Sequence, residues 1–376
     1  MIKVINVISD TNIGGAGTVL LTTLYNIDRS KFEVKVVLPE KSALIPKIDA
    51  LGFECIPTKG GADRSLDLHA VKEFIRIFKT EKPDIVHTHA AFSARLAAFL
   101  CGVRVRIYTR HSTFAPRPIL TRFPFKQLCG FINNTLSTAM IAVSESAKQN
   151  MTDVGINPKK IQVIINGAEP LREVDANEAS KLRKKLEIKD TDFVAGMSAR
   201  LDEVKGHIYL IEAARILCQR GTDNFKVLII GTGPLEQQLK DKVRDYGLES
   251  CIIFPGFVHD VAPYVQIMDI IVNCSFGTEA TSMALIEAMS LAKPAIATDY
   301  GGNAQIIENG KNGYIIPQKS ASNLAEAISK LMASPSKRLE MSKVAYSKYI
   351  CRLTGKIMTG KVEKLYEDGY LSRCKK

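Results

Sequence analysis

Long apolar runs are absent from this sequence, because no stretch approaches the roughly 18 apolar residues that a membrane-spanning helix requires. The N-terminal MIKVINVIS is a short apolar segment without the core of a signal peptide. The 8 cysteines form no C-x-x-C pair, so neither a disulfide framework nor a cysteine metal site is indicated. These absences predict a cytoplasmic protein whose thiols are reduced.

Acidic residues are missing from one long segment. Between residues 85 and 144 there is no Asp or Glu, although the whole chain holds 39 of them and carries a formal net charge of +12. The basic residues of this segment include Arg95, Arg104, Arg106, Arg110, Arg117, Arg122 and Lys126. Such an excess of positive charge favours an anionic partner without identifying it. A solvated basic face that binds nothing is the simpler alternative.

Several catalytic signatures are also missing. There is no G-x-S-x-G elbow, and no His, Asp and Glu residues have the spacing of a tight metal site. Two glycine-rich turns follow apolar strands, with glycines at Gly14, Gly15, Gly17, Gly231 and Gly233. Neither turn completes the dinucleotide fingerprint, and Leu20 stands where the first would need its third glycine. Both remain loops in which the backbone can approach a phosphate closely.

Short β-branched runs alternate with helix-like stretches along the whole chain. Candidate strands in the first half are KVINVIS, FEVKVVL, DIVHTH, RVRIYTR and AMIAVS, and those in the second half are DFVAGMS, KVLIIG, CIIFPG, DIIVNCS, PAIATD and GYIIP. Such alternation predicts βαβ units and mostly parallel sheets. A polar, charge-rich segment over 166–192 interrupts it, and we interpret this segment as a linker followed by a lead-in helix.

The predicted fold is therefore α/β, with two doubly wound, Rossmann-like domains in tandem, which also suits the length of the chain. We place the first domain at 1–168 and the second at 169–354. Ligands of open α/β sheets bind outside the carboxyl ends of the strands. We expect the two domains to face a central cleft, lined by the motifs that follow the strands.

Two glutamates, Glu279 and Glu287, stand eight positions apart in GTEATSMALIEAM. Thr281 or Ser282 can cap a helix that ends before Pro294. Glu279 then precedes the helix N-terminus, which attracts anions, and Glu287 lies about one and a half turns inside the helix. Because carboxylates bind hydroxyls well, a phosphate here could have a sugar beside one glutamate and a ribose beside the other. A loop charge and a solvent-facing helix residue are the simpler alternatives.

Cations and histidines also follow predicted strands. Arg200 and Lys205 flank a loop in SARLDEVKG, where two cations could neutralise a leaving diphosphate, although ordinary surface charge is the alternative. His87 and His89 end one strand and His111 follows another. A single histidine is more often structural than catalytic, but three at strand ends make at least one a candidate for the site.

Together these motifs resemble glycosyltransferase family 4, whose members are retaining enzymes of the GT-B fold. The resemblance covers nearly the whole chain, and its most specific element is E-x7-E, here Glu279 to Glu287 within EATSMALIEAMSLAKPAIATDYGG. The glycine-rich N-terminal loop, SARLDEVKG, IGTGP, FPGFV and ENGKNGYIIP follow in the order of the family. Ala280 stands where family members usually have glycine.

The resemblance implies a role for each matching residue. The implied catalytic residues are Glu279, His111, Arg200 and Lys205. The implied donor-binding residues are Gly15, Gly17, Arg200, Lys205, Gly231, Gly233, Phe257, Val258, Glu279, Ala280, Thr281, Ser282 and Glu287. Among them, Glu279 would contact the donor sugar and Glu287 the ribose, while Phe257 and Val258 would lie near the base. His111 would lie beside the donor sugar and the acceptor.

The resemblance also implies the reaction. A sugar would pass from a nucleotide-sugar donor, with UDP favoured by family frequency, to a polysaccharide or lipid-linked acceptor of cell-surface glycan synthesis. Neither a metal nor a protein nucleophile would be needed. The first domain would bind the acceptor and the second the donor, and the C-terminal helix at 355–376 would pack back on the first. A nucleotide-sugar epimerase and a non-catalytic sugar-binding protein are the alternatives.

The segment RHSTFAPRPILTRFPFKQLCGF, residues 110–131, interleaves basic and aromatic residues. This pattern suits an anionic membrane surface, so we expect a peripheral position on the inner face of the plasma membrane. The predicted acceptor and membrane face comprises His111, Arg117, Arg122, Phe123 and Lys126. Nucleic acid is the competing anion, but no recognition motif supports it. Alternatively, the phenylalanines belong to the core and the charges are merely solvated.

Overall fold

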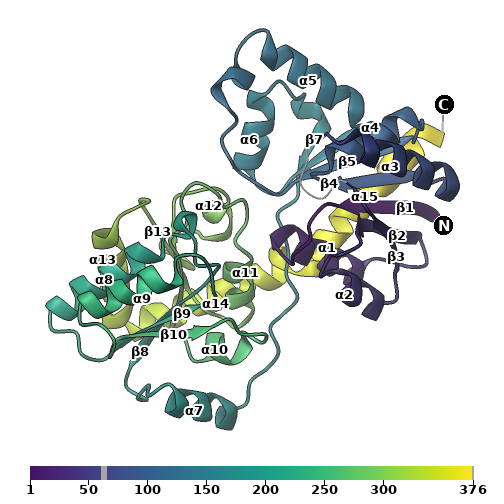
Figure 1. The fold of residues 1–376 in the computed structure, drawn as a ribbon. Helices are drawn as coiled ribbons and strands as arrows, with labels where there is room; N and C mark the ends of the chain where they lie inside the picture. Colours follow the sequence, from purple (N-terminus) through teal and green to yellow (C-terminus); the bar gives the residue numbers. More distant parts are fainter. Residues whose placement is uncertain (61–65, 375–376) are drawn as a thin grey trace. The chain divides into compact units, whose positions relative to one another are not determined.

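The computed structural model describes residues 1–60 and 66–374, and the chain divides into two compact units. Unit 1 comprises Met1–Ala168 and Thr354–Lys376, and unit 2 comprises Glu169–Leu353. Each unit is a parallel β-sheet whose strands alternate with helices (Figure 1). The predicted class, two doubly wound α/β domains, is therefore confirmed.

The sheet of unit 1 has seven parallel strands. In spatial order they are β3 (Glu54–Thr58), β2 (Phe32–Pro39), β1 (Ile2–Ile8), β4 (Ile85–His89), β5 (Val105–Arg110), β6 (Ala139–Ala142) and β7 (Ile161–Val163). The order of the strands reverses between β1 and β4. This point is where open parallel sheets bind ligands, beyond the carboxyl ends of the strands.

The helices of unit 1 connect these strands. They are α1 (Gly15–Asn26), α2 (Ile45–Ala50), α3 (Leu68–Glu81), α4 (Phe92–Leu100), η1 (Pro118–Thr121), α5 (Phe125–Leu136), α6 (Glu145–Asp153), η2 (Pro158–Lys160) and α15 (Gly355–Cys374). Helix α3 shows how the sequence sets the ends of a helix. At its start the Asp67 carboxylate accepts hydrogen bonds from the backbone N–H groups of His69 and Ala70. The helix ends at Lys82, whose backbone adopts the left-handed conformation and which precedes a proline.

Helix α15 joins unit 1 from the far end of the chain. Ala168 and Thr354 form a β-bridge where the chain leaves and re-enters the unit. The helix contacts α1 and β5, and in Figure 1 its yellow ribbon runs beside the purple α1. Its Tyr366 is completely buried against Phe32, with ring centroids 5.6 Å apart, and its Glu367 accepts from Lys31 at 3.0 Å. The core of unit 1 is therefore completed by residues from the C-terminal end.

The sheet of unit 2 has six parallel strands. In spatial order they are β10 (Ile252–Gly256), β9 (Phe225–Ile230), β8 (Phe193–Ser198), β11 (Ile270–Asn273), β12 (Ala295–Thr298) and β13 (Gly313–Ile316). The order reverses between β8 and β11, which gives unit 2 a switch point of its own. Fully buried strands such as β8, which reads FVAGMS, explain the continuous apolar runs in the sequence.

The helices of unit 2 are α7 (Ala176–Lys185), η3 (Glu203–Lys205), α8 (His207–Gln219), α9 (Glu236–Asp245), α10 (Ala262–Gln266), α11 (Met283–Ser290), α12 (Asn303–Ile306), α13 (Ala321–Ala333), α14 (Pro335–Lys348) and the π-helix η4 (Tyr349–Leu353). Helix α7, capped by Asp175, is the lead-in helix expected after the linker. Within the described ranges, no helix has both the length and the apolar character needed to cross a membrane.

Candidate functional site

The loops that follow β8 and β11 meet at the switch point of unit 2. The first carries Arg200 and Lys205, and the second carries Glu279 and leads into α11. The Lys205 Nζ lies 2.8 Å from Oε2 of Glu279, so the structure joins two of the predicted site residues directly. These residues are 74 positions apart in the sequence and come together because β8 and β11 are neighbours in the sheet.

Glu279 is held firmly in this loop. Its Oε2 also accepts from the Ser275 hydroxyl at 2.8 Å and from the Asn273 side-chain amide at 3.3 Å. The residue is only 7% exposed, and a buried carboxylate requires such donors to offset its lost hydration. The interpretation of Glu279 as a stray loop charge is therefore wrong.

The backbone beside Glu279 depends on glycine. Gly301 adopts a φ of +63°, and a Cβ at this position would overlap the carbonyl oxygen of Glu279. The N–H of Gly302 donates to the same oxygen at 3.2 Å. The loop after β12 therefore packs directly on the loop that carries the glutamate.

Helix α11 begins just beyond Glu279. The Ser282 hydroxyl accepts from the N–H of Leu285 at 3.4 Å, which confirms one of the two predicted caps. Ala280, Thr281 and Ser282 are all buried. The first N–H groups of α11 are thus ordered beside the Glu279 carboxylate, and such groups attract anions.

Glu287 lies in the second turn of α11. It is partly buried rather than fully solvent-facing, and burial raises the pKa of its carboxyl group. No lysine, arginine or histidine in the described part of the chain forms an ion pair with it. A half-buried carboxylate without a cation is suited to accept hydrogen bonds from neutral hydroxyls.

Arg200 and Lys205 do not touch the same group in this structure. Whereas Lys205 pairs with Glu279, the guanidinium of Arg200 pairs with Asp202 at 2.5 Å and remains 74% exposed. Arg200 is thus held by a carboxylate of its own loop and Lys205 by a carboxylate of the neighbouring loop. Whether they bind one diphosphate stays a prediction.

Gly231 and Gly233, in the turn after β9, have a packing role in the structure, and whether they also bind the donor stays a prediction. A Cβ on Gly231, whose φ is +132°, would overlap the carbonyl oxygen of Ala199, and one on Gly233 would overlap that of Leu201. The N–H of Leu201 also donates to the carbonyl of Thr232 at 2.9 Å. These glycines let the turn pack against the loop that carries Arg200, and so they support the predicted site.

Phe257 and Val258 follow β10, two strands away from β8. The Phe257 side chain is mostly exposed, and its ring meets that of His259 edge to face at 5.0 Å between centroids. An exposed aromatic ring at a strand end can stack on a planar ligand. The position of both residues near a base stays a prediction.

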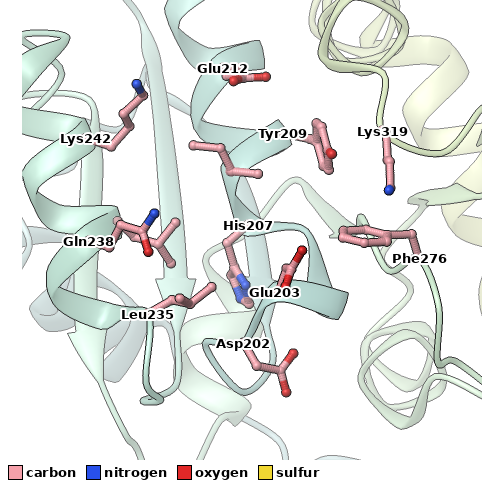
Figure 2. Close-up of a pocket in the computed structure, with 12 residues that line it drawn as sticks. Asp202, Glu203, His207, Tyr209, Glu212, Leu235, Gln238, Lys242, Phe276 and Lys319 are labelled. Carbon is pink, nitrogen blue, oxygen red and sulfur yellow. The ribbon is translucent and has the colours of Figure 1, made fainter.

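A cavity of about 500 Å³ lies along α8 and α9 and reaches Asp202 and Phe276 in the loops after β8 and β11, but none of the predicted donor-binding residues lines it (Figure 2). Tyr209 and Phe276 meet edge to face at 5.9 Å, and Lys319 Nζ lies 4.3 Å from the Phe276 ring centroid. His207 is almost completely buried, and burial lowers its pKa to about 4. Figure 2 shows that both carboxylates and lysine side chains line this groove.

At the switch point of unit 1, the glycine-rich loop leads from β1 into α1. Gly15 is exposed, and a Cβ there would meet nothing within 4 Å, so space alone does not require glycine. A Cβ on Gly17 would come 3.0 Å from a methyl group of Leu44. Gly17 therefore serves the packing of α1 against the residue that precedes α2.

The three histidines lie together, His87 and His89 within β4 and His111 directly after β5. His87 contacts the Tyr366 hydroxyl at 2.7 Å and the Thr109 hydroxyl at 2.6 Å, and burial lowers its pKa to about 3. His89 contacts His111 at 2.8 Å between Nδ1 and Nε2. His87 is thus a satisfied core histidine, whereas His111 is partly exposed at the edge of the cluster.

The phenylalanines of residues 110–131 are not core residues, so that alternative is wrong. Phe123 is 81% exposed and Phe131 is 70% exposed, and Phe114 and Phe125 are exposed as well. Arg117 and Arg122 flank η1 and are exposed, while Lys126 in α5 is half-buried. We use the name apolar–basic patch for the half-buried Lys126 together with the exposed side chains Phe114, Arg117, Ile119, Arg122, Phe123, Phe125, Leu128 and Phe131.

Sequence reasoning missed the residues that support the candidate residues. These include Asn6, Asn273, Ser275, Gly301 and Tyr366. The clearest available signal came from Asn6, a polar residue inside the apolar strand β1, and from Asn273, a polar residue that ends the apolar strand β11. Tyr366 gave none, because its partner His87 lies 279 positions earlier.

Two family descriptions match the sequence in succession. "Glycosyltransferase Family 4" matches residues 13–172, and "Glycosyl transferases group 1" matches residues 178–348. The putative glycosyltransferase EpsD of Bacillus subtilis is 28% identical over 291 residues, which are 74% of this chain and 75% of EpsD. The UDP-Gal:alpha-D-GlcNAc-diphosphoundecaprenol alpha-1,3-galactosyltransferase of Escherichia coli is 25% identical over 84% of each chain.

A solved structure supports the fold. HepE of Anabaena, in complex with UDP, has a TM-score of 0.85 and 20% sequence identity, over 98% of this chain and 100% of HepE. At this level of sequence identity the likeness supports the fold alone, and this fold is the predicted pair of Rossmann-like domains. Among the described residues, no three His, Cys, Asp or Glu side chains form a group that could hold a metal ion.

Proposed function

We propose that this chain, a hexosyltransferase-type glycosyltransferase of the GT-B fold, moves a sugar from a UDP-sugar to a lipid-linked or polysaccharide acceptor with retention of the anomeric configuration. The product would serve cell-surface glycan synthesis. The observation that carries the proposal is the Lys205–Glu279 pair beside the N-terminus of α11. A cation, a carboxylate and the N-terminus of a helix at one strand end suit a phosphate joined to a sugar.

Named relatives support the substrate classes. The Escherichia coli relative is named for a UDP-galactose donor and a diphosphoundecaprenol acceptor, and the HepE structure holds UDP. In the proposed reaction the acceptor hydroxyl attacks the anomeric carbon from the face that UDP leaves. The bond between that carbon and the phosphate oxygen breaks, and this oxygen takes the proton of the hydroxyl. Unit 2 would bind the donor and unit 1 the acceptor.

In this proposal, different residues of unit 2 bind different parts of the donor. Glu279 accepts hydrogen bonds from the sugar, and Glu287 accepts them from the ribose. Arg200 and Lys205 neutralise the diphosphate as it leaves. In unit 1, the loop at Gly15 and Gly17 would serve the phosphates and His111 the transferred sugar.

A panel of nucleotide sugars tests the proposed donor. We expect UDP-sugars, but not GDP- or ADP-sugars, to raise the melting temperature, since a ligand at 100 times its Kd stabilises by about 2.7 kcal/mol. When no acceptor is present, we expect the protein to hydrolyse the matching UDP-sugar slowly to free sugar and UDP. The anomeric proton coupling of a transfer product should report the configuration of the donor. An inverted product would overturn retention, and an epimerised donor without UDP release would identify an epimerase instead.

We further propose that the apolar–basic patch docks on an anionic lipid surface. Its aromatic side chains are exposed and interleaved with Arg117, Arg122 and Lys126, and the surrounding residues 85–144 include no acidic side chain that would repel anionic headgroups. A membrane surface there would bring a lipid-linked acceptor to the histidine side of unit 1, because the patch follows His111 in the sequence.

Charge reversal of the patch tests this docking. Each basic residue near an anionic surface contributes about 1 kcal/mol, so replacing Arg117, Arg122 and Lys126 with Glu should weaken binding to anionic vesicles by roughly 100-fold or more. Co-sedimentation at low and high salt measures the change. The matched control replaces the exposed Lys181, Lys184 and Lys185 of α7 with Glu, which alters the net charge equally. Equal pelleting of both variants, or pelleting independent of anionic lipid, would contradict the docking.

A further inference from the structure

The three histidines of unit 1 form a stack of neutral rings. The centroids of His87 and His89 are 4.5 Å apart, and those of His89 and His111 are 5.1 Å apart. Burial lowers the pKa of His111 to about 4, and burial together with the neighbouring rings holds the pKa of His89 well below its usual value. Near pH 7 each ring therefore has one N–H donor and one lone-pair acceptor.

Asn6 fixes the direction of the hydrogen bonds in this stack. The Nε2 of His89 lies 3.2 Å from the Asn6 Oδ1, which can only accept, so this nitrogen carries the proton. Among the described residues the Asn6 Nδ2 has no hydrogen-bond partner, and its Oδ1 is the atom directed at His89.

The protonation of His89 also determines which atom donates in its hydrogen bond with His111. Because Nε2 of His89 is protonated, its Nδ1 is an acceptor, and the His111 Nε2 that lies 2.8 Å away must donate to it. The remaining nitrogen of His111, Nδ1, must therefore be an acceptor. This atom is buried and has no hydrogen-bond partner within the described residues.

We propose that His89, oriented by Asn6, is a positioning residue that fixes the tautomer of His111 and leaves Nδ1 to accept a hydrogen bond from a substrate hydroxyl. The inference rests on the proposed function insofar as the substrate is a sugar or an acceptor alcohol. A neutral acceptor nitrogen binds a hydroxyl but repels the oxygens of a phosphate. His111 therefore selects for a hydroxyl and has no part in neutralising the diphosphate.

The space around the stack agrees with this assignment. A cavity of about 20 Å³ is lined by all three histidines and by residues of α1 and α15. One water or hydroxyl needs about 10–15 Å³, so this cavity is large enough for no more than one small polar group.

The tautomer can be observed directly by long-range ¹H–¹⁵N correlation spectra of the full chain with ¹⁵N-labelled histidine, recorded at pH 7 without substrate. The His111 signals are those that disappear in His111→Gln. We expect a protonated Nε2 and an unprotonated Nδ1. A protonated Nδ1, or a doubly protonated ring, would overturn the proposal whether or not the protein transfers sugar.

Two substitutions of His89 test the positioning role. In His89→Asn, a side-chain oxygen replaces the Nδ1 acceptor, so the His111 tautomer should be retained. In His89→Leu the acceptor is lost, and we expect both tautomers of His111 to be populated. An unchanged spectrum in a folded His89→Leu would contradict the role. If that variant does not fold, Asn6→Leu removes the group that orients His89 and should mix the tautomers in the same way.

Kinetic measurements distinguish a positioning role of His89 from a purely structural role. In His89→Leu we expect kcat/KM for transfer to fall about tenfold, as the loss of one hydrogen bond of roughly 1.4 kcal/mol would produce, with UDP affinity unchanged. His89→Asn should recover most of the lost rate. Loss of UDP affinity in His89→Leu, or no recovery in His89→Asn, would assign His89 a structural role only.

Discussion

Replacing Glu279 with glutamine is expected to lower kcat for sugar transfer by a factor of about 10²–10³, the cost of removing one preorganised electrostatic contact from an active site. Glutamine preserves the shape of the side chain and can still accept from the Ser275 hydroxyl, so the loop should keep its conformation. It removes the charge that holds Lys205 at 2.8 Å and that faces the donor sugar in the proposed reaction. Steady-state transfer rates at saturating donor measure the effect.

Glu287→Gln is the matched control for this prediction. It makes the same chemical change eight positions later, at a carboxylate that lies inside α11. We expect it to weaken nucleotide binding and to leave kcat within a few-fold of the wild type. Near-normal turnover of Glu279→Gln at saturating donor would contradict the role of Glu279, and equal kcat losses in both variants would remove the distinction between them.

Removing either Arg200 or Lys205 should weaken UDP binding by roughly 10- to 100-fold, because a hydrogen bond to a charged group contributes about 1.5–3 kcal/mol. The two losses should not add. A diphosphate held between two cations is released when either is removed, so the double Ala variant should bind UDP little worse than each single one. Calorimetric titration of the four proteins measures the coupling.

The structure sharpens the test of this clamp. Lys205 is fixed by Glu279, whereas Arg200 must leave Asp202 and move from a largely exposed position to reach the same ligand. Asp202→Asn, which removes the competing carboxylate, should therefore strengthen UDP binding or leave it unchanged, but only while Arg200 is present. Small and strictly additive effects of Arg200→Ala and Lys205→Ala would exclude a shared ligand.

The sequence identified nearly all strands, because each is a short apolar run between helices. The exceptions are β3, which reads ECIPT with an internal proline, and β7, whose three residues IQV are too short to form a pattern. Proline and brevity both weaken the signals on which strand prediction depends. The parallel class of both sheets followed from the alternation of strands and helices.

The candidate site was predictable in its residue types but not in its contacts. The position of Glu279 ahead of a helix followed from its neighbours, since Ser282 is a good N-cap. Its ion pair with Lys205 could not be predicted, because the two residues meet only through the pairing of β8 with β11. The same holds for His87, whose partner Tyr366 comes from the last helix of the chain.

The central claim is that a nucleoside diphosphate binds at the strand ends of unit 2, beside Lys205 and Glu279, and not in the groove along α8 and α9. Titration of UDP into the wild type, Lys205→Ala and Lys242→Ala tests it most directly, because Lys242 lines the groove and Lys205 does not. We predict that Lys205→Ala binds UDP at least about tenfold more weakly than the wild type and that Lys242→Ala binds it equally well. Affinity that survives in Lys205→Ala and is lost in Lys242→Ala would contradict the claim.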